Sequence, residues 1–221
     1  MNREATPYLA ELIGTFSFVL LGAGAITVNN ANTGTLGVLG IALANGLGLA
    51  ALIYAFGHVS GANFNPAVTI ALWITKKLEP SVAALYIIAQ LFGAVLAGIF
   101  IEGFLGGASL AVPIIPGKLD AVGATFIEAL LTFVLVLVIY GSLVDRRSHT
   151  GHSGLAIGLA YSALILVGFN LTGAALNPAR VFGPAFVDNL WTNHLIYWIG
   201  PIVGAVVAGL VYENGVLRSK E

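Results

Sequence analysis

The tripeptide Asn-Pro-Ala occurs twice in this chain, as Asn65-Pro66-Ala67 and Asn177-Pro178-Ala179. Each copy interrupts an apolar segment that would otherwise be long enough to cross a membrane. Because asparagine is a strong N-cap and proline suits the first helical position, each copy predicts the start of a helix. A helix that begins at membrane depth directs its positive N-terminus at whatever lies beyond it, and irregular backbone there is tolerated only inside protein or beside a water-filled cavity. Two such starts, one in each half of the chain, indicate a pore whose centre repels cations.

The composition is that of a membrane protein. Of the 221 residues, 58% are hydrophobic and 9% are charged, whereas a soluble domain typically carries about 25% charged residues. The net charge of −1 gives no indication of nucleic-acid binding. The absence of cysteine excludes disulfides and thiolate metal sites. No metal or cofactor is expected, because the histidines form no cluster with metal-ligand spacing: His58, His149, His152 and His194.

Six apolar stretches are long enough to cross a bilayer, which takes about 20 mostly apolar residues per helix. Two shorter runs, about 66–75 and 178–187, each follow or begin within an Asn-Pro-Ala, and we interpret them as half-helices that dip into the membrane and return. The first stretch is too long for a signal-peptide core and is expected to be retained. The predicted fold is an all-α membrane protein with two re-entrant half-helices and six transmembrane helices at about 8–28, 36–58, 82–105, 121–143, 153–170 and 195–217.

The basic residues predict the orientation in the membrane. Cytoplasmic loops carry an excess of Lys and Arg, and only Lys118 and Arg180 fall on the opposite side of the proposed topology. Both termini are therefore expected in the cytoplasm. The residues that share the cytoplasmic side are Arg3, Lys76, Lys77, Arg146, Arg147, Arg218 and Lys220.

The two halves of the chain repeat. Glu11 corresponds to Glu128, and small residues recur at a constant offset, with Gly93, Ala94, Ala97 and Gly98 matching Gly204, Ala205, Ala208 and Gly209. Because each unit has three spans, the second enters the membrane from the opposite side, as in the inverted repeats of transporters. We expect one channel domain over 1–221, with repeats at about 8–105 and 121–217, and we expect the small residues to serve close helix packing.

These motifs resemble the aquaporin and aquaglyceroporin family, the major intrinsic proteins. The resemblance covers residues 8–213 and is carried by the segments 60–69 and 173–180 and by the paired Glu11 and Glu128. One departure is Asn63, where many members have histidine. The resemblance implies a passive channel for water and small neutral solutes such as glycerol, which excludes protons and ions. It also implies a homotetramer, and the short, cysteine-free chain is compatible with a prokaryotic member in the plasma membrane.

The two asparagines and Arg180 are the central pore candidates. Each asparagine amide is expected to donate a hydrogen bond to a permeating water while its carbonyl caps local backbone. A water that accepts from both asparagines cannot readily accept a proton from its neighbour, and the helix N-termini oppose cations. The alternative for the asparagines is simple capping. An unpaired arginine within a membrane usually lines a cavity; the alternative for Arg180 is an ion pair with Glu128 or Glu102.

Further pore residues follow from the resemblance by counting from the motifs. Asn45, Ile165 and Ala174 join Arg180 in the family's selectivity filter. Strict water channels usually place an aromatic residue and a histidine where this chain has Asn45 and Ile165. A mixed wall of Ile165 and Arg180 could admit a small polyol, while Asn45 departs from both the water-channel and the glycerol-channel patterns. The alternative for Ile165 is core packing. In the family, the backbone carbonyls before each half-helix line the lumen; here they belong to Gly61, Ala62, Asn63, Phe64, Gly173, Ala174, Ala175 and Leu176.

Glu11 and Glu128 lie in the middle of spans. A proton relay is one interpretation of buried carboxylates. Their equivalent places in the repeat favour the family's use of them, which is to accept hydrogen bonds from the half-helix loops. The histidines remain open: His58 near the cytoplasmic mouth is expected to serve contact or packing, and His149 and His152 to belong to a pH gate or to a solvated loop.

Two other classes of function compete with a channel. A secondary transporter also has inverted repeats and broken helices, but it would normally place carboxylates beside the breaks, where this chain has amides and an arginine. A membrane enzyme finds no support, because no nucleophile–base pair, metal cluster or phosphate loop is present in the sequence.

Overall fold

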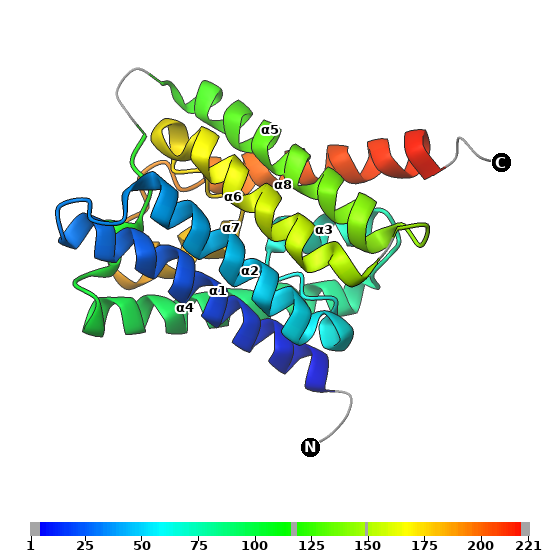
Figure 1. Cartoon of the computed structure of the whole chain (residues 1–221), viewed down its shortest axis with the longest axis horizontal. Coiled ribbons are helices and arrows are strands. Elements are labelled where there is room, and N and C mark those ends of the chain that lie inside the picture. Colours follow the sequence, from blue (N-terminus) through cyan, green and yellow to red (C-terminus); the bar gives the residue numbers. More distant parts are fainter. Residues whose placement is uncertain (1–4, 116–118, 149, 218–221) are drawn as a thin grey trace.

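The computed structural model describes residues 5–115, 119–148 and 150–217, and every regular element in them is helical. Six long helices form a bundle (Figure 1). Two short helices, α3 (Pro66–Ile74) and α7 (Pro178–Val187), lie inside it. The long helices are α1 (Thr6–Ala31), α2 (Gly37–Ser60), α4 (Pro80–Phe104), α5 (Ala121–Ile139), α6 (Ser153–Thr172) and α8 (Ile196–Val211).

This architecture confirms the predicted fold class of six spans and two half-helices. The spans also run close to their predicted bounds. Two of them end in π-helical turns, with α5 continuing into η3 (Tyr140–Val144) and α8 into η5 (Tyr212–Leu217). The first helix is longer than predicted, since Asn29–Ala31 continue it. The side-chain oxygen Oδ1 of Asn29 accepts from the backbone N–H of Gly37 at the start of α2, at 2.8 Å.

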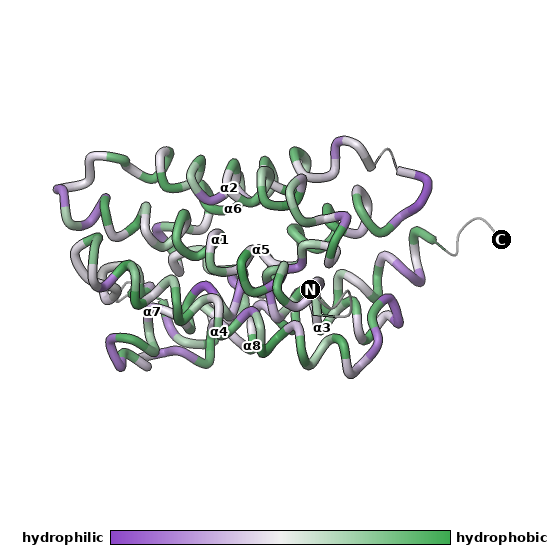
Figure 2. Tube along the Cα trace, turned by 90° about the horizontal axis from the view of Figure 1, so that it is seen from below, coloured by the Kyte–Doolittle hydropathy of each residue, from purple (hydrophilic) through white to green (hydrophobic). Residues whose placement is uncertain are grey.

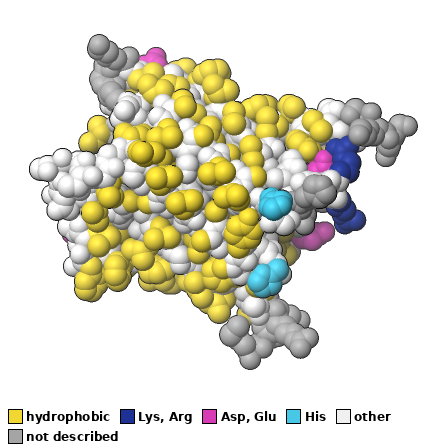
Figure 3. Space-filling model, in the orientation of Figure 1, with side chains coloured by type: hydrophobic (Ala, Val, Ile, Leu, Met, Phe, Trp, Pro, Cys, Tyr) yellow, Lys and Arg dark blue, Asp and Glu magenta, His cyan; other side chains and the backbone are white. Residues whose placement is uncertain are grey.

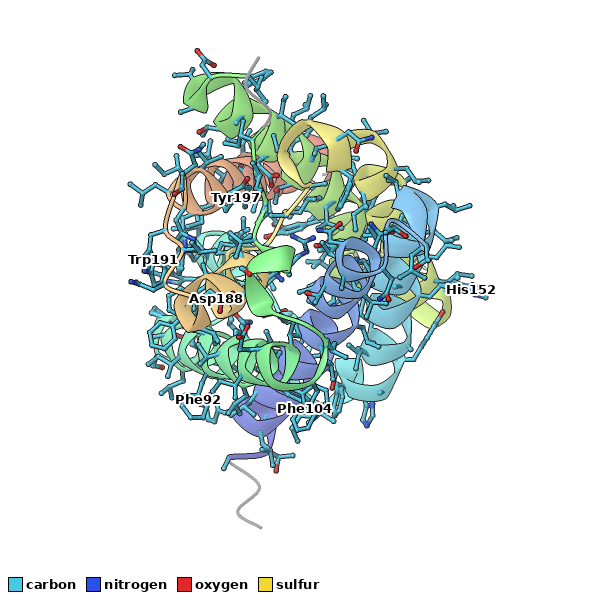
Figure 4. All side chains as sticks on the ribbon, turned by 90° about the vertical axis from the view of Figure 1, so that its left-hand side faces the viewer. Phe92, Phe104, His152, Asp188, Trp191 and Tyr197 are labelled. Carbon is cyan, nitrogen blue, oxygen red and sulfur yellow. The ribbon has the colours of Figure 1, made fainter. Side chains whose placement is uncertain are left out.

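The outside of the bundle is apolar, as a lipid-facing surface requires. Hydrophobic side chains cover most of the face seen in Figure 3. Phe92 and Phe104 point away from the bundle in Figure 4 and are 58% and 75% exposed. Figure 2 shows hydrophobic residues along the long helices and hydrophilic ones in the loops at the two ends. A soluble monomer rarely exposes so much contiguous apolar surface, so the chain is a multi-pass membrane protein.

Equivalent helix pairs pack through equivalent glycines. Helix α1 packs on α4 and α5 packs on α8. A Cβ atom at Gly93 would collide with the carbonyl oxygen of Leu12, and one at Gly204 would collide with that of Ala129. Without side chains at these two positions, the helix backbones approach closely, as small residues allow in membranes. This close packing fixes the positions of the long helices that surround α3 and α7.

The described Lys and Arg side chains other than Arg180 gather at one end of the bundle. Both ends of the described chain lie at this end, which we call the terminal face (Figure 1). Lys and Arg side chains appear at the same end in Figure 3. The described members of the predicted cytoplasmic set are Lys76, Lys77, Arg146 and Arg147. Arg3, Lys118, Arg218 and Lys220 lie outside the described residues, as does His149.

Candidate functional site

The two Asn-Pro-Ala segments start helices as predicted, and each asparagine caps its own half-helix. Asn65 and Asn177 have extended backbones, with φ of −152° and −151°. The side-chain oxygen of Asn65 accepts from the N–H of Ala67 at 2.9 Å, and that of Asn177 accepts from the N–H of Ala179 at 2.9 Å. Proline at the first helical position completes each start. These contacts show that each asparagine side-chain oxygen caps the helix that follows it, as the sequence predicted.

The same two asparagines also join the half-helices to each other. The Nδ2 of Asn65 donates to the carbonyl oxygen of Leu176 at 2.8 Å, and the Nδ2 of Asn177 donates to that of Phe64 at 2.8 Å. The tips of α3 and α7 therefore meet inside the bundle. Each amide carries two N–H groups, so one on each asparagine is left over after the cross-bond. Sequence reasoning missed this reciprocal pair.

The loops before the half-helices adopt unusual backbone conformations. Gly61 and Gly173 end α2 and α6 with φ of 88° and 86°, a region that glycine enters without steric cost. Non-glycine residues in such conformations persist only where their surroundings hold them in place. The loops contain four of these at equivalent positions, namely Ala62, Phe64, Ala174 and Leu176.

Glu11 holds the first loop. One carboxylate oxygen accepts from the hydroxyl of Ser60 at 2.6 Å and from the N–H of Asn63 at 2.9 Å. The other accepts from the N–H of Phe64 and from the Nε2 of Gln90, both at 2.8 Å. The residue is fully buried. Buried backbone donors need partners, and Glu11 supplies acceptors for two that the helix ladder cannot reach.

Glu128 does the same for the second loop. Its carboxylate accepts from the hydroxyl of Thr172 at 2.6 Å, from the N–H of Ala175 at 3.0 Å and from the N–H of Leu176 at 2.9 Å. Glu128 is also fully buried. Apart from the bond from Gln90 to Glu11, the contacts of both carboxylates are with the loops and with the last helical residue before each loop, which is the arrangement that a bracing role requires.

Two tyrosines that the sequence did not indicate as site residues bind the backbone immediately before the same two loops. The hydroxyl of Tyr86 donates to the carbonyl oxygen of Ser60 at 2.9 Å. The hydroxyl of Tyr197 donates to that of Thr172 at 2.9 Å. Tyr86 and Tyr197 open the repeated segment that contains Gly93 and Gly204, so comparison of the two repeats could have found them.

Arg180 follows the second Asn-Pro-Ala and is buried without a partner. Only 1% of it is exposed. None of its three guanidinium nitrogens has a hydrogen-bond partner among the described residues, and no described carboxylate forms an ion pair with it. The ion pair with Glu128 or Glu102 that sequence analysis weighed is therefore absent from the described structure. A buried charge without a partner is costly, so these donors are available to whatever occupies the space beside them.

Two cavities approach the meeting point of the half-helices from opposite sides. The first, of about 230 Å³, runs from Lys77 and Val144 to the two asparagines, and we call it the Asn65 cavity. The second, of about 250 Å³, is lined by Arg180 and Gly173 with apolar walls that include Ile26 and Phe169, and we call it the Arg180 cavity. Since Asn177 and Arg180 are three residues apart, their Cα atoms differ by about 4.5 Å along a helix axis. The separation between the cavities is therefore short.

The predicted pore residues divide between these cavities and the protein interior. The Asn65 cavity is lined by Gly61, Ala62, Asn63 and Phe64, and the Arg180 cavity by Gly173. Ala175 and Leu176 are fully buried. The carbonyl oxygen of Ala175 already accepts from the hydroxyl of Tyr161 at 2.9 Å, which leaves it one lone pair. The carbonyls of Phe64 and Leu176 are partly occupied in the same way by the asparagine cross-bonds.

The four filter candidates are not brought together by contacts in the structure. Asn45, Ile165 and Ala174 are fully buried and line neither cavity. Asn45 donates from Nδ2 to the carbonyl oxygen of Ile41 at 2.8 Å, while its own Oδ1 has no partner among the described residues. On α6, a Cβ at Gly168 would lie 3.1 Å from the Cβ of Ala174. Ile165 lies one turn from Gly168 on the same helix face.

Comparisons with known proteins agree with this geometry. Over residues 3–212 the sequence matches the major intrinsic protein family. It is 42% identical to aquaporin-4 of Mus musculus over 213 residues, which are 92% of this chain and 65% of that protein. It is 42% identical to aquaporin AqpM of Methanothermobacter thermautotrophicus, with 93% of this chain and 95% of that protein covered. The solved structure of the aquaglyceroporin from Plasmodium falciparum superimposes with a TM-score of 0.84 and 28% identity over 96% of both chains. The chain therefore belongs to the major intrinsic protein family.

Proposed function

We propose that water, and small neutral solutes such as glycerol, cross the membrane through the Asn65 cavity, past the two asparagines, and through the Arg180 cavity. Members of this family are channels, and the chain is accordingly a passive channel and not an enzyme. The observation that carries the proposed path is the reciprocal pair of asparagine bonds, because it sets two opposed helix N-termini beside each other at the place where the cavities approach.

The exclusion of protons and ions follows from this arrangement. The remaining N–H of Asn65 and that of Asn177 donate to the oxygen of a passing water, which then cannot accept a proton from the next water in the file. Two helix N-termini add positive potential at the same place. Arg180 adds a full positive charge in the second cavity. Water and neutral solutes carry no charge for these groups to repel.

The assembly and location are proposed on further grounds. The gathering of basic residues at the terminal face supports a cytoplasmic location of both termini. The repeated contacts of Glu11 and Glu128 support a single domain over 1–221 with repeats at about 8–105 and 121–217. The resemblance to the family supports a homotetramer with one pore per subunit in a plasma membrane. The archaeal relative, covered over 95% of its length, supports a prokaryotic member.

The first test is an osmotic jump in a stopped-flow instrument. Vesicles that contain the protein are expected to shrink faster than empty vesicles, with a low activation energy and without dissipating a pH gradient. The same vesicles report glycerol flux by reswelling in a glycerol gradient. Slow water flow together with saturable uptake coupled to an ion gradient would instead identify a secondary transporter.

Ile165→His tests the proposed filter. The imidazole adds polar bulk to the proposed filter wall, to which Ile165 contributes apolar atoms. The flux of glycerol, whose carbon atoms would contact that wall, is expected to fall about tenfold, and the flux of water less. Paired water and glycerol permeabilities measure the ratio. Val167→His, at a residue of the same helix that is 68% exposed and lines neither cavity, is the matched control and should change neither permeability. Equal loss of both fluxes in Ile165→His would remove this residue from the filter.

A further inference from the structure

The terminal face contains a pocket that the channel path does not use. Its cavity, of about 360 Å³, is lined by the side chains of Lys77, Val144, Asp145, Arg146, Arg147 and Leu217, and we call it the rim pocket. The π-helical turns η3 and η5 border it, with Val144 ending the first and Leu217 the second. Such turns are rare and frequently occur at functional sites.

The acidic residue in this pocket is already neutralised. Arg147 donates from Nε to one oxygen of Asp145 at 2.9 Å and from its terminal nitrogen to the other at 2.5 Å. The Tyr212 hydroxyl also donates to Asp145, at 3.0 Å. The hydrogen bonds from Arg147, more than any other contact, hold the pKa of Asp145 below its usual range, so this carboxylate stays ionised and paired at neutral pH. It therefore offers little repulsion to a second anion.

Of the remaining two cations, Arg146 is unpaired among the described residues and Lys77 has one ion-pair partner. Arg146 is exposed and forms no hydrogen bond or ion pair with any residue in the described parts of the chain. Lys77 lies 3.0 Å from Glu213, and its side chain is 36% exposed. With three cations against the two carboxylates of Asp145 and Glu213, the pocket carries a net positive charge. An unpaired guanidinium is well suited to bind phosphate oxygens in a bidentate manner.

We propose that the rim pocket binds the phosphate group of an anionic membrane lipid, with Arg146 as its main contact and Lys77 as its second. The phosphate chemistry follows from the guanidinium and the ammonium. The lipid source follows from Val144 and Leu217, which give the pocket apolar walls at the end of two spans, where headgroups lie. Basic pockets between transmembrane helices on the cytoplasmic side bind such headgroups.

The pocket adjoins the proposed channel. Lys77 and Val144 line both the rim pocket and the Asn65 cavity. A bound headgroup would therefore lie beside the mouth of the Asn65 cavity. The binding itself does not depend on conduction, so it can be tested separately from the proposed function.

The test is a titration of the full-length protein in detergent with short-chain phosphatidylglycerol, with short-chain phosphatidylcholine in a parallel series, followed by native mass spectrometry. The protein is expected to bind the anionic lipid more tightly than the zwitterionic one. Arg146→Gln should weaken binding of phosphatidylglycerol by about fivefold, the effect of one surface cation. Because Arg146 is exposed and unpaired, this variant is expected to fold normally, and circular dichroism verifies it.

Lys76→Gln is the matched control. Lys76 is an exposed cation beside Lys77 that does not line the rim pocket. Its replacement by glutamine therefore removes one positive charge from the same face and leaves the pocket intact. It should leave the affinity for phosphatidylglycerol nearly unchanged. Equal weakening by both variants would show that diffuse surface charge, and not the pocket, attracts the lipid. Equal binding of the two lipids by the native protein would also overturn the proposal. Displacement of the lipid by low concentrations of inorganic phosphate would assign the pocket to a soluble anion instead.

Discussion

Arg180→Ala is expected to convert a channel that blocks cations into one that leaks them. The guanidinium is 1% exposed, and its three nitrogens have no partner among the described residues. No described carboxylate forms an ion pair with it, and the residue lines the Arg180 cavity, so its charge acts on whatever enters that cavity. Two unit charges about 4 Å apart repel by roughly 4 kcal/mol at the effective dielectric constant near a protein surface. Loss of that barrier corresponds to roughly a hundredfold or larger rise in cation flux, even with the helix N-termini still opposing it.

Proteoliposomes with an entrapped pH-sensitive dye and a potassium diffusion potential measure this leak, and the osmotic jump measures water flux in the same preparation. Water flux is expected to persist, because removal of an unpaired side chain leaves no other group without its partner. Arg180→Lys keeps the charge and should keep the vesicles tight. A leak in Arg180→Ala no larger than in the native protein would mean that the arginine serves the fold and does not guard the pore.

The fold was predictable because its signals are local. A run of about 20 apolar residues specifies a span wherever it occurs, and Asn followed by Pro specifies a helix start from two adjacent residues. The ends of the spans were less predictable, because they also depend on contacts with residues that are not adjacent in the sequence. The polar residues Asn29 and Asn30 lower the hydropathy at the end of α1, yet the helix continues through them because Asn29 finds partners at the start of α2.

The sequence predicted the capping asparagines and the two glutamates that contact the loops, but not the contacts between the half-helices. The bond from Asn65 to Leu176 joins positions that only the tertiary fold brings together, so no local pattern indicates it. Counting along a helix gives the depth of Ile165 and Asn45 in the membrane but not the direction of their side chains, which depends on how α2 and α6 pack. Gln90 escaped notice because its counterpart in the second repeat is Pro201, which cannot donate a side-chain hydrogen bond.

Glu128 has no counterpart of Gln90 beside it, because Pro201 stands at that position of the second repeat, so substitution of Glu128 is expected to have a large effect. Glu128→Leu removes the acceptor of three buried donors, on Thr172, Ala175 and Leu176. Each unsatisfied donor costs about 1–3 kcal/mol, and the sum is comparable with the total stability of many domains, about 5–15 kcal/mol. We expect a large fall in the thermal unfolding temperature in detergent and loss of water flux per folded protein, because the loop before α7 no longer holds its conformation.

Glutamine substitutions separate bracing from proton transfer, and they should affect the two repeats unequally. Glu128→Gln keeps one acceptor but turns an amide N–H toward a backbone donor, so it should be clearly destabilising. In Glu11→Gln, rotation of the Gln90 amide can offer its Oε1, which has no partner among the described residues, to the new N–H. The rotation also takes Nε2 away from the hydroxyl of Thr69, to which it donates at 2.9 Å. The loss at Glu11 should therefore be smaller than that at Glu128 by at most about one hydrogen bond, roughly 1 kcal/mol, and Gln90→Leu should abolish the difference. A Glu128→Gln protein with native stability and water flux but an altered proton current would refute bracing and restore the proton relay.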